Sequence, residues 1–190
     1  MKKALLAFIT AALLLTTASC GESTGAPEST TAADSSVTTL AADSKEPSGF
    51  YFTAAGTDVL PGTSPSGILE ALGEQTDPPF IAPSCAFQGD DKTYFFPGYE
   101  VRVNEEDGAE FIYTISLKDD SVTTPEGIYI GAPRSDVIAA YGEPLKEQNG
   151  VLVYTKGTTN LEIALTDETV SQILYIDNAA LPMDGYAAGL

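Results

Sequence analysis

The sequence has no histidine and only two cysteines, Cys20 and Cys85. Histidine is the most frequent general base in enzymes, and a neighbouring imidazole is a common activator of a catalytic thiol. The sequence also lacks the nucleophile-elbow, phosphate-loop and zinc-ligand motifs that mark common enzyme classes. These absences weigh against catalysis, and we expect no catalytic residue, no cofactor and no metal ion.

Basic residues are scarce as well, with 9 lysines and arginines against 27 acidic residues and a formal net charge of −18. Lys2 and Lys3 directly follow Met1. The other seven are scattered singly, as Lys45, Lys92, Arg102, Lys118, Arg134, Lys146 and Lys156. Binding of nucleic acid requires clustered cations, so we expect no nucleic-acid partner. An acidic surface suits an extracellular protein, a cationic partner or divalent ions, and it does not choose between them.

Residues 1–20 have the order of a secretory signal: two lysines, an apolar run over residues 4–15, and then small residues. The run is well short of the roughly 20 residues that span a bilayer. The ending Thr17-Ala18-Ser19-Cys20-Gly21 resembles the lipobox of bacterial lipoproteins, although Thr17 replaces the usual leucine. The resemblance implies that Cys20 is diacylated and anchors an extracytoplasmic protein to the membrane. An ordinary signal peptide with an unmodified Cys20 remains the alternative.

With Cys20 lipidated, Cys85 has no partner within the chain. A free thiol in an exported protein is buried and inert, exposed and reactive, or paired between molecules. We expect Cys85 to be a small core residue, since nothing in the sequence activates it.

Residues 21–47 are rich in serine, threonine, alanine and acidic residues and cannot form a core. We expect them to be a disordered tether that holds the folded part away from the membrane. Residues 179–190 have little pattern and are expected to be a loosely docked tail.

A motif that occurs twice organises the remainder of the chain. One copy runs over residues 62–74 and the other over residues 131–143, and each opens with glycine and closes with Gly-Glu at the same spacing. Apolar residues within each copy fall on one face of a helix, so each predicts one short helix. The glycines that define the copies are Gly62, Gly73, Gly131 and Gly142.

Segments rich in β-branched and aromatic residues follow each copy of the motif. Strands are expected over residues 93–96, 99–103, 111–117, 151–154, 161–165 and 171–176, with turns at Pro97-Gly98 and Asp107-Gly108. A hairpin is expected at residues 49–60, an entering strand at 127–130, and a proline-rich connection at 75–91. The predicted fold class is therefore α+β, with two tandem repeats at residues 48–122 and 123–178. Each repeat is a short helix packed on an antiparallel three- to four-stranded sheet.

The second copy and its surroundings resemble a known group of proteins. The residues that carry the resemblance are Gly131, Asp136, Val137, Tyr141, Gly142, Glu143, Pro144, Tyr154, Val170 and Ile173. Their pattern is similar to that of the small outer-membrane-assembly lipoproteins and the β-lactamase inhibitory proteins, and other stretches are similar to uncharacterised lipoproteins of anaerobic Gram-positive bacteria. The resemblance implies a tandem fold that binds other proteins, and it carries over no catalytic residue.

The leading functional hypothesis is a lipid-anchored binding or scaffolding module with a protein partner at the cell envelope. Tyrosines on an exposed sheet face would suit such a partner, and the candidates are Tyr94, Tyr99, Tyr113, Tyr154 and Tyr175. The alternatives are an envelope hydrolase that uses two carboxylates, for which the repeat-related pair Glu100 and Glu162 would have to converge, and an enzyme-inhibiting lipoprotein. The turn at residues 104–108 leaves a calcium-binding lipoprotein as a further alternative.

Overall fold

The computed structural model describes residues 47–181, all of which lie in the compact unit Ser44–Leu190. The expected signal segment, Cys20, the tether up to residue 46 and the tail beyond residue 181 lie outside the described residues. The described elements, in chain order, are β1 (Phe52–Ala54), β2 (Thr57–Val59), α1 (Ile68–Ala71), β3 (Asp77–Pro83), β4 (Asp90–Phe96), β5 (Tyr99–Glu106), β6 (Ala109–Leu117), α2 (Arg134–Tyr141), β7 (Lys146–Gln148), β8 (Val151–Lys156), β9 (Thr159–Thr166) and β10 (Thr169–Asp177).

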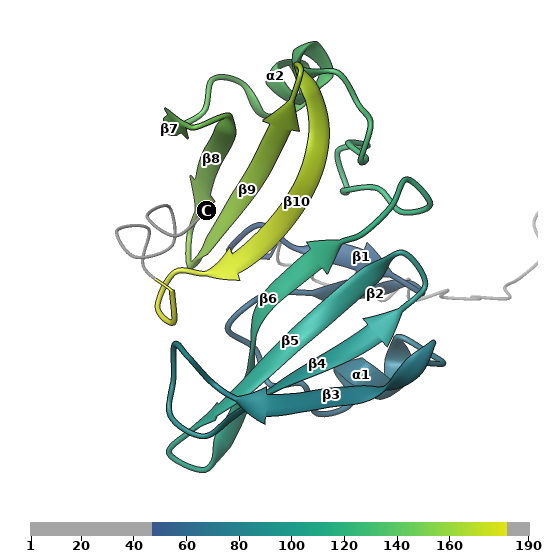
Figure 1. Cartoon of the computed structure of the whole chain (residues 1–190), viewed down its shortest axis with the longest axis vertical. Helices are drawn as coiled ribbons and strands as arrows, with labels where there is room; N and C mark the ends of the chain where they lie inside the picture. The colour runs from purple at the N-terminus through teal and green to yellow at the C-terminus, as the bar shows by residue number, and fades with distance from the viewer. Residues whose placement is uncertain (1–46, 182–190) are drawn as a thin grey trace, which may run out of the picture. The chain divides into compact units, whose positions relative to one another are not determined.

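The expected α+β fold class is wrong, because the described chain is mostly β. Strands β3 to β10 form one eight-stranded antiparallel sheet in the order β3-β4-β5-β6-β10-β9-β8-β7 (Figure 1). The two helices have four and eight residues. Helix α1 is a single turn, and a helix this short buries too few side chains to form a layer of its own.

Two strands at the edges of the sheet account for much of the difference between the expected and the observed fold. The proline-rich segment expected as a connection forms β3, and the wholly polar segment Lys146–Gln148 forms β7. Proline is tolerated in an edge strand, where a missing N–H breaks no bond to a further strand. Residues 127–130, which were expected to form a strand, are instead part of the loop before α2.

Most of the other expected elements are confirmed. The hairpin β1–β2 lies within residues 49–60, the six expected strands lie within β4, β5, β6, β8, β9 and β10, and turns connect β4 to β5 at Pro97-Gly98 and β5 to β6 at Asp107-Gly108. The four motif glycines all have positive φ, between 76° and 105°. At Gly142 this conformation ends α2, and a residue with a side chain would be strained there.

The register places one residue from each of the eight strands in a single line across the sheet, which we call the central row. Its members are Asp77, Phe95, Glu100, Ser116, Leu174, Glu162, Val153 and Lys146. Directly paired residues of antiparallel strands point to the same side of a sheet. We call that side the row face and the opposite side the core face.

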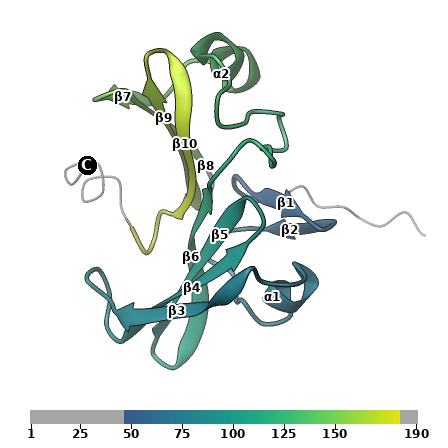
Figure 2. The same cartoon turned by 45° about the vertical axis from the view of Figure 1, so that its right-hand side comes forward.

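The core face packs against the hairpin β1–β2 and the two helices, which lie together on one side of the sheet in Figure 2. Phe52 of β1 is 1% exposed. Its ring centroid lies 4.9 Å from that of Tyr99 on β5 and 6.2 Å from that of Tyr175 on β10. The hairpin therefore joins the two halves of the sheet through one aromatic cluster. Neither helix of residues 47–181 is long and apolar enough to cross a membrane.

Candidate binding face

The five tyrosines expected at an exposed partner face do not form one. Tyr99, Tyr113, Tyr154 and Tyr175 are between 1% and 6% exposed. Tyr94 is half-buried and packs against the core. The alternation along the strands predicts which residues share a face, but it does not predict which face is covered by the rest of the chain. Four of the five face the core and are structural: Tyr94, Tyr99, Tyr154 and Tyr175. Only Tyr113 lines the depression of the row face that is described below.

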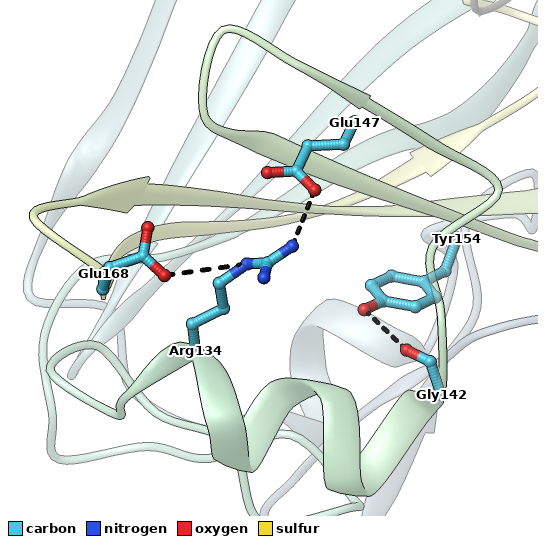
Figure 3. Close-up of polar contacts among 5 residues, drawn as sticks. All are labelled: Arg134, Gly142, Glu147, Tyr154 and Glu168. Atoms are coloured by element: carbon cyan, nitrogen blue, oxygen red, sulfur yellow. Dashed lines mark hydrogen bonds and ion pairs between the residues drawn. The ribbon is translucent and has the colours of Figure 1, made fainter.

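Tyr154 illustrates the structural role (Figure 3). Its hydroxyl donates a hydrogen bond of 3.2 Å to the carbonyl oxygen of Gly142, where α2 ends. At the other end of α2, the Arg134 guanidinium lies 2.6 Å from a carboxylate oxygen of Glu147 on β7 and 3.9 Å from one of Glu168 in the β9–β10 turn. Helix α2 therefore contacts the sheet at both ends. A helix of eight residues is only marginally stable in water by itself, so it depends on such contacts.

The row face carries a depression of about 300 Å³ over its first half. Its aromatic residues are Phe80 on β3, Phe95 on β4 and Tyr113 on β6, and its charged residues include Glu100 and Arg102. Phe80 is 61% exposed, which is unusual for so large an apolar side chain. Tyr113 is the extra residue of a β-bulge and packs against Phe87 with a centroid separation of 5.0 Å. This depression has an aromatic lining with charged groups beside it.

The second half of the row face carries a depression of about 250 Å³, which is built from β7, β8, β9 and β10. Lys146, Gln148, Val153, Glu162 and Gln172 are among its lining residues. Glu162 is only 5% exposed. Burial raises the pKa of its carboxyl group, and the positive charge of Lys146 partly offsets this effect. This half of the face therefore combines a buried acid with amide and apolar side chains.

The two carboxylates of the hydrolase alternative do not converge. Glu100 and Glu162 belong to the same row, but two strands, β6 and β10, separate them. Three inter-strand steps of about 4.8 Å put their backbones about 14 Å apart. Carboxylate pairs of glycosidases lie about 5–9.5 Å apart. Glu100 is also ion-paired to Lys118 at 3.3 Å. Each carboxylate lines a different depression, so this pair does not support a hydrolase.

Two further expectations concern the turns. Cys85 is exposed, in the connection between β3 and β4, and the expectation that it lies in the core is wrong. The segment expected as a calcium-loop alternative is the end of β5 and its turn, where the Asn104 side chain donates to the Asp91 carboxylate at 2.7 Å. Within residues 47–181, no three cysteine, aspartate or glutamate side chains are grouped as ligands for a metal ion.

The sequence carries a signal for the second depression but none for the first. Leu161, Glu162 and Ile163 alternate, which places Glu162 on the face opposite to two core residues. Phe80 was missed because the three prolines around it indicate a loop.

Comparison with protein-family models, with curated proteins and with solved structures found no match to this chain.

Proposed function

We propose that this protein is a lipid-anchored, extracytoplasmic binding module that holds a protein partner of the cell envelope on the row face of its sheet. The observation that carries the proposal is the aromatic depression at Phe80, Phe95 and Tyr113, with the 61% exposed Phe80 at the edge strand. Aromatic side chains that are partly buried beforehand lose little entropy on binding, and they commonly anchor protein partners. The lipobox-like ending at Cys20 supplies the anchor.

The size of the row face favours a protein over a small ligand. The central row crosses eight strands, and seven steps of about 4.8 Å give a width of about 34 Å. This width is close to the roughly 30 Å diameter of a small domain. Two separate depressions lie on the same face, and a single small molecule would reach only one of them.

The sheet edges are less suited to a partner. An edge strand binds another strand through free backbone groups. Strand β3 contains Pro78, Pro79 and Pro83, which have no N–H to donate, and β7 is three residues long. Prolines and very short strands at an edge suppress strand pairing between chains. The partner is therefore expected on the face of the sheet.

Neighbouring residues of β3 provide a matched pair of variants. Phe80 pairs with Thr93 and lines the row face, whereas Ile81 pairs with Lys92 and points to the other side of the sheet. The two side chains are 61% and 56% exposed, so alanine at either position should change stability by less than about 0.5 kcal/mol.

The test is co-purification of envelope proteins with the full chain, followed by identification of the retained protein. We expect wild type and Ile81→Ala to retain the same protein and Phe80→Ala to lose at least nine tenths of it. Equal retention by both variants would contradict the aromatic anchor at Phe80.

A further inference from the structure

Glu162 is a buried carboxylate with apolar neighbours on both sides. On β9 it pairs with Val153 of β8 and with Leu174 of β10, and these side chains are 2% and 7% exposed. Glu162 itself is 5% exposed and lines the 250 Å³ depression of the row face. Its head group is therefore removed from most of the solvent but faces a space that a ligand can enter.

The Glu162 carboxylate has no hydrogen-bond or ion-pair partner among residues 47–181. Lys146 stands in the same row, beyond Val153, and acts on Glu162 only through its charge. A buried ionised carboxylate without a partner is costly, and protein interiors normally supply it with a cation or with donors. An ionised carboxylate only accepts hydrogen bonds, so the missing partner must be a donor.

The charge of the chain indicates which kind of donor. The formal net charge is −18, and only nine lysines and arginines are present. Such a surface attracts cations and repels acidic groups. The other polar groups of the depression, among them Gln148 and Gln172, are neutral and can accept further N–H groups from an ammonium or a guanidinium.

We infer that the Glu162 depression binds a lysine or arginine side chain of the protein that docks on the row face. This inference rests on the proposed function and adds the chemistry of the partner: a basic protein places one cationic side chain against Glu162 while its apolar surface covers Phe80. Lys146 competes weakly with that cation for the same carboxylate.

The inference is tested with two capped peptides, N-acetyl-Ala-Lys-Ala-amide and its norleucine counterpart, which differ in the ammonium group. Binding to the methyl-labelled full chain is followed by NMR at the methyl groups of Val151, Val153 and Leu174, which lie in or beside the depression. We expect the lysine peptide to bind at least tenfold more tightly than the norleucine peptide. Equal affinities would overturn the inference.

Three variants make the result specific. Glu162→Gln should abolish the preference for lysine, whereas Glu70→Gln, which removes the same charge from an exposed position on α1, should retain it. Lys146→Met should tighten binding of the lysine peptide about two- to fivefold, because a competing cation is removed. Weaker binding by Lys146→Met would show that Lys146 helps to hold the peptide instead of competing with its ammonium group, and would overturn this assignment of the depression.

The same variants separate this inference from the proposed function. If Glu162→Gln retains the envelope partner as wild type does while Phe80→Ala loses it, the row face is a binding face and the role of Glu162 is refuted. If Glu162→Gln loses the partner and Phe80→Ala retains it, the inference stands and the aromatic anchor is refuted. Thermal unfolding checks that Glu162→Gln is folded. We expect it to be, because the amide has nearly the shape of the carboxyl group.

Discussion

Replacing Phe52 by alanine tests whether the hairpin β1–β2 holds the two halves of the sheet together. Phe52 is 1% exposed and contacts Tyr99 of one half and Tyr175 of the other. Removing a buried phenylalanine costs about 3–5 kcal/mol, through lost burial and the cavity that remains. The loss is large compared with a total stability of about 5–15 kcal/mol. At about 3 °C per kcal/mol, it corresponds to a fall in Tm of roughly 12 °C.

The assay is urea unfolding of the full chain followed by circular dichroism, with Phe80→Ala as the control. The control makes the same substitution at a side chain that is 61% exposed, and we expect it to cost less than about 0.5 kcal/mol. The slope of the unfolding free energy with urea should be unchanged in both variants. A cost below about 1 kcal/mol for Phe52→Ala would refute the packing of the hairpin against both halves.

Other predictions concern the two cysteines and Glu162. Cys20→Ala should move the protein from the membrane fraction to the soluble fraction, whereas the Cys85→Ala protein should stay in the membrane fraction. A Cys20→Ala protein that still requires detergent for release would refute the lipid anchor. Because Cys85 is exposed, a thiol reagent should label it in the native protein at nearly the rate seen in urea; protection by a hundredfold would contradict that exposure. Burial raises the pKa of Glu162, so folding strengthens proton binding there and the charged form destabilises the protein at neutral pH. Glu162→Gln should therefore unfold at a higher temperature than wild type at pH 7, with the difference shrinking as the pH falls through the raised pKa, and a lower Tm at pH 7 would show that the carboxylate is stabilised by a partner.

The local elements of this fold could be predicted from the sequence because their signals are short-range. Pro97-Gly98 and Asp107-Gly108 are turn residues with a conformational reason, and the strands beside them alternate clearly. The edge strands were missed because β3 contains three prolines and β7 is entirely polar, and both are strands only because a neighbour pairs with them. The wrong expectation of an α+β fold class followed from those two missing strands and from a first helix expected to be longer than the single turn of α1.

The candidate site depends on long-range information that the sequence alone does not contain. The alternation around Glu162 defines its side of the strand, but its alignment with Val153, Leu174 and Lys146 requires the register of four strands. For the tyrosines, the sequence shows the residue type but not which distant segment covers them. Tyr99 and Tyr175 have a residue type suited to interfaces, and both are buried because Phe52 of a distant hairpin packs between them.

The most direct test of a partner on the row face is photo-crosslinking in living cells. A photoreactive p-benzoylphenylalanine replaces Thr93 or Gln172 on the two halves of the row face, or Glu70 on α1 as the control. We predict that Thr93→p-benzoylphenylalanine and Gln172→p-benzoylphenylalanine cross-link to the same envelope protein and that the Glu70 variant does not. Cross-links from Glu70 alone would contradict the proposal, since they would place the partner on the side of the sheet that carries the helices.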